Sequence, residues 1–201
     1  MRRPRLMLAS ANPDKVAEME LLLESVVEVL PRPVGLPDVV EDGETLEANA
    51  RLKAEAVCRA TNCAAIADDT GLFVDALGGE PGVRSARYAG ENAGYADNLM
   101  KLLADLDGVT PPVRSAHFRT VAMICYPDGN ELVATGTVEG RIAETPSGIG
   151  GFGYDSVFIP DEGDGTTFAE MADDKHRFSH RGRALRALMS MLNTPPASET
   201  G

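Results

Sequence analysis

The stretch Leu6-Met-Leu-Ala-Ser-Ala-Asn-Pro-Asp-Lys15 predicts the first unit of the fold. Leu6–Ala9 is a short apolar run, typical of a buried strand, and it ends in a polar turn. Asn12 followed by Pro13 is typical of a helix N-cap with proline at the first helical position. Apolar side chains then recur at helical spacing, at Val16, Met19, Leu22 and Leu23. We therefore expect a strand, a tight loop and a helix, as in α/β proteins.

The rest of the chain alternates strand-like and helical segments. Strands are expected at Val26–Leu30, Ala64–Ala67, Leu72–Ala76, Arg114–Tyr126, Glu131–Gly140 and Val157–Ile159, and helices at about 45–61, 95–106 and from Ser179 onward. Pro127-Asp-Gly-Asn130 predicts a hairpin turn between two of these strands. Gly78–Gly94 reads as a long irregular loop, and Thr167 with Glu170 forms a capping-box pattern. This order of elements predicts a mixed-sheet α/β protein.

Composition excludes several classes of protein. The 201 residues carry a net charge of −12, which argues against a nucleic-acid partner because backbone binding needs a basic surface. No window approaches the roughly 18 apolar residues of a membrane span, so we expect a soluble protein without a membrane partner. The apolar part of the N-terminus is also too short for a signal peptide. Three cysteines without a redox or zinc spacing favour a reducing, cytoplasmic compartment.

Two acidic pairs and the first loop are candidates for phosphate and metal chemistry. Ser10–Lys15 lies where a strand ends and a helix begins, so free N–H groups and Lys15 favour an anion. Glu41-Asp42 and Asp68-Asp69 are adjacent carboxylates, the second pair expected at a strand end. Mg²⁺ uses one or two such carboxylates with water and phosphate oxygens. The alternatives are ordinary helix capping for the loop and solvated acidic turns for the pairs.

A glycine-rich loop and a basic segment are candidates for binding a base. Gly150-Gly-Phe-Gly-Tyr-Asp155 places glycines on both sides of Phe152, which lets a planar ligand approach the ring. Five of the 19 cations fall between Lys175 and Arg186, with two of the three histidines. The alternatives are a tight turn around a core aromatic and a solvated helix face. Taken together, the candidates predict a magnesium nucleotide as the ligand.

The same residues also carry a family resemblance. The chain resembles the inosine triphosphate pyrophosphatase family over about residues 6–188. The motifs, in order, are Ser10-Ala-Asn-Pro-Asp-Lys15, Thr45-Leu-Glu-Ala-Asn-Ala50, Ala67-Asp-Asp-Thr-Gly-Leu72, Ala76-Leu-Gly-Gly-Glu-Pro-Gly-Val83 with Ser85-Ala-Arg-Tyr88, Gly151-Phe-Gly-Tyr-Asp155 and Ser179-His-Arg-Gly182. One departure is Asp14, where the family often has glycine before the first lysine.

The resemblance implies a fold, a reaction and a set of site residues. The fold is a two-lobed α/β domain over residues 1–194, with an elongated mixed sheet, a cleft between the lobes and a disordered tail at 195–201; the protein is expected to be a homodimer. The reaction is hydrolysis of ITP, dITP, XTP or dXTP to monophosphate and pyrophosphate with Mg²⁺. Asp69 resembles the general base and a metal ligand, and Glu41 a second metal ligand. The implied substrate contacts are Ser10, Ala11, Asn12, Pro13, Asp14, Lys15, Lys53, Thr70, Phe152, Gly153, Tyr154, Asp155, Lys175, His180 and Arg181.

Base selectivity follows from hydrogen bonding. A 6-oxo purine presents an acceptor where adenine presents an amine, so donors from His180 or Arg181 favour hypoxanthine and xanthine. Two other functions stay open at this point. One is a related pyrophosphatase for pyrimidine or other modified nucleotides, and the other is a catalytically silent nucleotide sensor.

Overall fold

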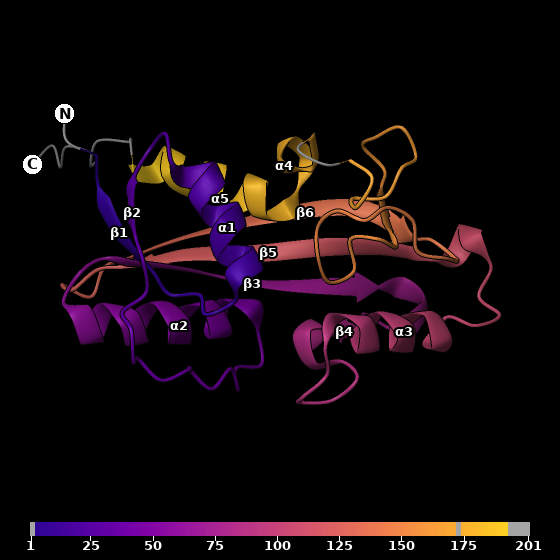
Figure 1. Ribbon diagram of the computed structural model, residues 1–201, viewed down its shortest axis with the longest axis horizontal. Coiled ribbons are helices and arrows are strands. Elements are labelled where there is room, and N and C mark those ends of the chain that lie inside the picture. The colour runs from indigo at the N-terminus through magenta and orange to yellow at the C-terminus, as the bar shows by residue number, and fades with distance from the viewer. Residues whose placement is uncertain (1–2, 172–173, 193–201) are drawn as a thin grey trace, which may run out of the picture.

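The computed structural model describes residues 3–171 and 174–192, and the tail expected at 195–201 lies outside them. Within these residues the strands form one seven-stranded mixed sheet of order β2-β1-β3-β5-β6-β7, with β4 paired to β3 (Figure 1). The strands are β1 (Arg5–Leu8), β2 (Glu28–Leu30), β3 (Ala65–Val74), β4 (Pro81–Gly82), β5 (Ser115–Cys125), β6 (Glu131–Ile142) and β7 (Phe158–Pro160). The helices are α1 (Pro13–Leu23), α2 (Leu46–Thr61), α3 (Tyr95–Asp105), α4 (Lys175–Phe178) and α5 (His180–Leu192), with short 3₁₀ helices η1 (Asp75–Leu77), η2 (Ser85–Arg87) and η3 (Pro111–Val113).

Strand β3 connects the two halves of the sheet. Its first residues pair in parallel with β1, and its whole length pairs antiparallel with β5, from Ala65 opposite Cys125 to Val74 opposite Ala116. The expectation of two strands here, with Asp68-Asp69 at the end of the first, was therefore wrong. Both aspartates lie inside one continuous strand, because cations from other elements compensate their burial, as described below.

The predicted hairpin is confirmed, whereas two other local predictions need correction. Strands β5 and β6 are joined at Pro127–Asn130, where Gly129 has a φ of +88°. The segment Gly78–Gly94 is not wholly irregular, since it contains β4 and η2. Thr167 N and Glu170 Oε2 make the expected bond at 2.8 Å, but they close a turn rather than start a helix.

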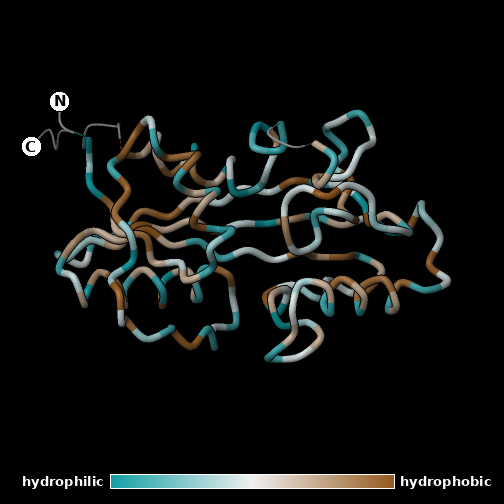
Figure 2. The backbone as a smooth tube through the Cα atoms, viewed as in Figure 1, coloured by the Kyte–Doolittle hydropathy of each residue, from teal (hydrophilic) through white to brown (hydrophobic). Residues whose placement is uncertain are grey.

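Helices cover both faces of the sheet and define two lobes. In the first lobe, α1 and α5 lie on one face and α2 on the other (Figure 1). In the second lobe, α3 packs against the far ends of the long strands around Leu102, Phe118 and Phe158. Hydrophobic residues recur along α3 and along the strands near β1, where these cores lie (Figure 2). No helix in the described ranges is both long and apolar enough to cross a membrane.

Local signals explain where the first two helices begin. Asn12 caps α1, its side chain accepting from the N–H groups of Asp14 and Lys15 at 3.0 and 3.2 Å. Thr45 caps α2 by accepting from Ala48 N at 3.1 Å. Both caps satisfy N–H groups that have no partner within the helix. They also fix where Lys15 and Lys53 face the sheet, which matters for the site.

Candidate active site

A cavity of about 440 Å³ lies between the lobes, a size usual for small-molecule sites. Most of the expected site residues line it: Ser10, Ala11, Asn12, Lys15, Glu41, Lys53, Asp69, Thr70, Phe152, Gly153, Tyr154, Asp155, Lys175, His180 and Arg181. Pro13 and Asp14 do not, and Asp14 faces a neighbouring hollow instead. Segments far apart in the sequence thus meet around one space.

Carboxylates and lysines alternate at the end of the cavity formed by α1, α2 and β3. Lys53 Nζ lies 2.9 Å from Asp69 Oδ1 and 2.9 Å from Glu41 Oε2. Lys15 Nζ lies 3.5 Å from Asp68 Oδ2 and 4.0 Å from Asp69 Oδ1. Asn49, one turn before Lys53 on α2, donates to Asp69 Oδ2 at 3.3 Å. Two lysines and an amide therefore hold the Asp69 carboxylate in one orientation.

Burial and neighbouring charges act in opposite directions on these groups. Burial lowers the pKa of Lys15, and the attraction of Asp68 only partly offsets it. Burial also disfavours the charged form of Lys53, but Asp69 and Glu41 outweigh it and raise the pKa above its usual value. Burial would raise the pKa of Asp68, yet Lys15 and Arg181 hold it far below its usual range. Asp68 is therefore ionised at neutral pH.

The carboxylates suit a hydrated divalent cation. In the part of the chain that is described, no group of three or more His, Cys, Asp or Glu side chains is placed to hold a metal ion. Glu41 and Asp69 nevertheless converge on one position, since both touch the same ammonium group. Mg²⁺ needs only one or two carboxylates when water and phosphate supply the other oxygens. The donor set therefore fits Mg²⁺ held jointly with a phosphate ligand.

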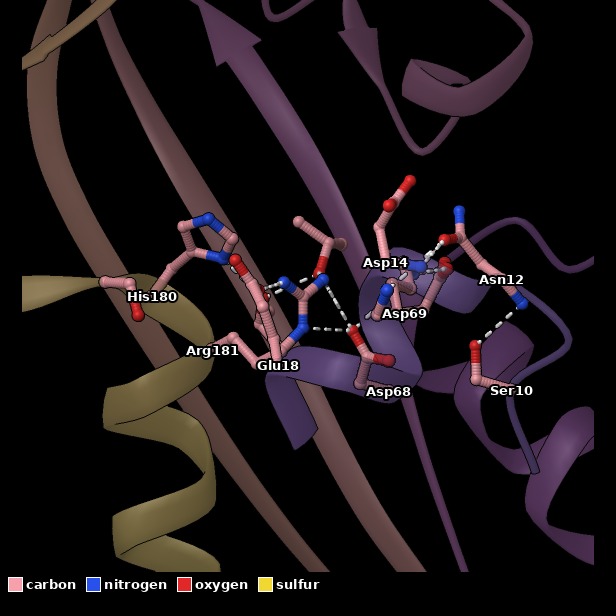
Figure 3. A network of polar contacts seen from close by, with 12 residues as sticks. Ser10, Asn12, Asp14, Glu18, Asp68, Asp69, His180 and Arg181 are labelled. Atoms are coloured by element: carbon pink, nitrogen blue, oxygen red, sulfur yellow. Dashed lines mark hydrogen bonds and ion pairs between the residues drawn. The ribbon is translucent and has the colours of Figure 1, made fainter. Parts of the chain in front are cut away.

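Arg181 connects the acidic end of the cavity to its aromatic end. Only 2% of the residue is exposed, and its guanidinium contacts Asp68 Oδ2 at 3.1 Å and also Glu18 (Figure 3). Glu18 also accepts from Lys175 Nζ at 2.6 Å, and Lys175 reaches Asp155 Oδ2 at 2.7 Å. A charged chain thus runs from β3 through α5 and α1 to the glycine-rich loop. It leaves few free donors on Arg181.

An aromatic face forms the other end of the cavity. Lys175 Nζ and Arg181 Cζ lie 5.2 and 5.7 Å from the centre of the Phe152 ring. Asp155 accepts from Phe152 N at 2.9 Å, which fixes the glycine-rich loop. The Tyr154 hydroxyl donates to Ser85 O at 2.8 Å, so its role is to join this loop to η2. Phe152 is thus one of the rings that line this end of the cavity, with Tyr95 and Phe118.

His180 is a buried, uncharged imidazole beside the aromatic face. Burial, reinforced by Arg181, lowers its pKa well below the usual value. Its ring stacks on Phe118 at 4.5 Å, and Nδ1 lies 2.6 Å from Thr120 Oγ1. Thr120 Oγ1 in turn lies 2.7 Å from Thr70 Oγ1. A neutral histidine offers one donor and one acceptor, which suits recognition of a base edge.

Several residues of the site were not predicted from the sequence. Glu18 and Thr120 carry no local signal, because one lies on an ordinary amphipathic helix and the other inside a strand. Asn49 lies within the motif Thr45–Ala50, but no role in the site was predicted for it. Tyr95 also lines the cavity. It belongs to a helix that reads as purely structural.

The fold and site define an α/β protein with a cleft between its lobes that is lined by lysines and carboxylates at one end and by aromatic rings at the other. Residues 6–191 match the sequence model of the Ham1 family, and the chain belongs to this family. The dITP/XTP pyrophosphatase of Methylococcus capsulatus is 48% identical over 195 residues, which cover 94% of this chain and 96% of that protein. The dITP/XTP pyrophosphatase of Bacillus licheniformis is 43% identical over 193 residues, which cover 94% and 97%. These relatives confirm the family resemblance.

Solved structures of the same family confirm the expected fold. The HAM1 protein from Coxiella burnetii superposes with a TM-score of 0.85 at 38% identity, covering 94% of this chain and 98% of that one. The Staphylococcus aureus Ham1 protein gives a TM-score of 0.82 at 39% identity, with the same coverage. At this level of identity the likeness extends beyond the fold to the family.

Proposed function

We propose that this protein is a nucleoside triphosphate pyrophosphatase that hydrolyses deaminated purine nucleotides, dITP or ITP and XTP or dXTP, to the monophosphate and pyrophosphate. Relatives that are 41–48% identical over most of the chain carry the name dITP/XTP pyrophosphatase. One structural observation carries the proposal. A single cavity joins Lys15, Lys53 and Asp69 at one end to Phe152 and His180 at the other.

The acidic end receives the triphosphate. The capped start of α1 directs backbone N–H groups and a helix dipole toward an anion, and Lys15 and Lys53 add charge. Phosphate oxygens repel an incoming nucleophile, so these cations lower the barrier by neutralising charge in the transition state. Mg²⁺ held by Glu41 and Asp69 would supply further neutralisation.

Asp69 is the proposed general base. Asn49 and Lys53 each bind one of its carboxylate oxygens, so the group is oriented by α2. It accepts a proton from the attacking water, a step usually worth on the order of 10²–10⁴-fold in rate. Asp68 cannot take this role, because it lies outside the cavity lining and is bound to Arg181.

The aromatic end selects the base. Phe152 stacks on the purine, and a donor directed at O6 favours hypoxanthine and xanthine over adenine. His180 is the stronger candidate for this donor, because each guanidinium nitrogen of Arg181 already contacts Asp68, Glu18 or Thr70. A buried donor facing the adenine amine would lose its partner, which costs binding.

Assembly and location are further proposals. A homodimer rests on the family resemblance alone. A cytoplasmic location rests on the absence of a redox or zinc spacing among Cys58, Cys63 and Cys125, all of which are free thiols in the structure. Gel filtration with light scattering would test the dimer directly.

The decisive experiment is pyrophosphate release across a nucleotide panel. Purified protein is assayed with dITP, XTP, dATP, dGTP and dCTP, each with Mg²⁺ and with EDTA. Rapid release from dITP and XTP alone, and only with Mg²⁺, is the expected result. Equal rates on all five nucleotides would refute the selectivity. Release from dCTP alone would show that the substrates are pyrimidine nucleotides and not deaminated purine nucleotides. Tight binding of dITP without release would make the protein a sensor.

A further inference from the structure

Tyr95, the first residue of α3, reaches from the second lobe to the start of α1 in the first. Its hydroxyl accepts from Asn12 Nδ2 at 2.8 Å and donates to Asp14 Oδ2 at 2.9 Å. Its ring centre lies 5.6 Å from that of Phe152. The start of α3 is itself fixed, because Asp97 accepts from Gly94 N at 2.8 Å. One side chain thus contacts both Ser10–Lys15, the proposed phosphate loop, and the glycine-rich loop that contains Phe152.

The hydroxyl fixes the orientation of the Asn12 side chain. Asn12 Oδ1 accepts from two N–H groups of α1, so its amide nitrogen must point the other way. That nitrogen donates to the Tyr95 hydroxyl oxygen. A flipped amide would lose bonds at both ends. The cap that orients the phosphate loop is therefore held from the opposite lobe.

The same hydroxyl holds the Asp14 carboxylate outside the cavity. Asp14 directly precedes Lys15, and a carboxylate there would repel a triphosphate. In the structure it lines the neighbouring hollow and bonds to Tyr95. Burial raises the pKa of Tyr95; the bond from Asn12 opposes this rise and the bond to Asp14 adds to it, so the pKa lies above its usual value and the hydroxyl keeps its proton at neutral pH.

We propose that Tyr95 is a positioning residue that clasps the phosphate loop across the cleft and keeps the Asp14 carboxylate away from the bound triphosphate. It acts through Asn12 and Asp14 rather than on the reacting atoms. This inference rests on the proposed function for its kinetic consequence. The clasp is the pair of hydrogen bonds that the Tyr95 hydroxyl makes with Asn12 and Asp14, and it can be tested without measuring turnover.

The kinetic test removes the hydroxyl and then the charge. Tyr95→Phe retains the ring beside Phe152 but frees the carboxylate, so KM for dITP should rise about five-fold with kcat within about two-fold. In an Asp14→Asn background the same change removes only the bond to Asn12, so KM should rise less than about two-fold. Added salt should shrink the penalty in Tyr95→Phe, since it screens exposed charges. A merely structural tyrosine would show neither the rescue nor the salt effect.

Tyr126→Phe is the matched control. Tyr126 packs against the hydrophobic core beneath α1 and α5 and does not line the cavity. Removing its hydroxyl should therefore leave KM and kcat as in the wild type. The proposal is overturned if Tyr95→Phe leaves KM unchanged, or if it raises KM by the same factor in the wild-type and Asp14→Asn backgrounds.

Tyrosine titration tests the clasp independently of catalysis. With ¹³C-labelled tyrosine, the resonance lost in Tyr95→Phe is assigned and followed against pH. Its pKa should lie above the usual value in the wild type and fall in Asp14→Asn. An identical pKa in both proteins would overturn the clasp. A wild type that hydrolyses no nucleotide would refute the proposed function instead, and the titration would still decide the clasp.

Discussion

The ammonium group of Lys53 lies 2.9 Å from Asp69 Oδ1 and equally far from Glu41 Oε2, so one buried cation holds both carboxylates of the proposed metal site. Lys53 is 7% exposed and Asp69 5%, so this pair is poorly hydrated, whereas the Glu41 side chain is 35% exposed. Without a cation, two converging carboxylates would repel each other. The lysine therefore keeps the site assembled before substrate and metal arrive.

Lys53→Met should destabilise the protein and make it respond to magnesium. Removing one partner of a buried pair leaves uncompensated charge, and we expect a loss of about 2–4 kcal/mol in the free energy of unfolding. Urea denaturation measures this. Mg²⁺ should restore part of the loss, because it can take the vacated place between the carboxylates.

Lys101→Met is the control for that substitution. Lys101 pairs with Asp105 at 2.8 Å on the surface of α3, where 40% of the lysine side chain is exposed. Such pairs contribute about 0–1 kcal/mol. Equal stability of the two variants, with no magnesium effect in either, would contradict the account of Lys53.

Asp69→Asn should abolish turnover but leave the protein folded. The amide cannot accept the proton from water, so kcat should fall by about 10²–10⁴-fold, while the circular dichroism spectrum stays native. Asp107→Asn, an exposed carboxylate beyond α3, is the control and should retain full activity. Near-normal turnover in Asp69→Asn would assign the base to another group.

Local patterns predicted the elements whose causes are local. The Asn12 and Thr45 caps and the Pro127–Asn130 turn depend on neighbours within a few residues, and each was confirmed. Asp68 and Asp69 failed as a predicted strand end because charged residues normally interrupt a buried strand. Here Lys15, Lys53 and Arg181 compensate them from α1, α2 and α5.

The site residues that escaped prediction share one physical reason. Glu18 joins Lys175 and Arg181 across more than 150 residues of sequence, at separations of 157 and 163. Thr120 acts only because β5 pairs with β3 and places it opposite Thr70. Neither partner can be read from residues nearby. The roles of Glu18 and Thr120 could not be predicted because their partners are distant in sequence, not because a motif was weak.

Gly136→Ala should dislodge the start of α5 from the sheet. A Cβ at this position of β6 would lie 2.1 Å from His180 O and 2.5 Å from Ala184 N, and these backbone atoms cannot rotate away. The helix must move, taking His180 and Arg181 with it. We expect a stability loss of about 1–3 kcal/mol or more and a large fall in kcat/KM, measured by thermal unfolding and pyrophosphate release.

Gly94→Ala provides the comparison for stability. The nearest atom to a Cβ there is Asp97 Oδ2 at 3.5 Å, an ordinary contact. Its loss of stability should be well under that of Gly136→Ala. If the two alanine variants unfold at the same temperature, the close approach of α5 to β6 does not determine the stability cost of a side chain at position 136.

Stability should fall between pH 7 and pH 5 because of His180. Its pKa is lowered in the folded protein by burial and by Arg181, so below about pH 6.5 the unfolded chain binds a proton that the folded protein does not. The free energy of unfolding therefore decreases as pH falls, by up to about 1.4 kcal/mol per pH unit. Urea denaturation at half-unit steps measures the slope. His180→Gln removes the titrating group, so its slope in this window should be markedly flatter, and an unchanged slope would place the proton uptake elsewhere.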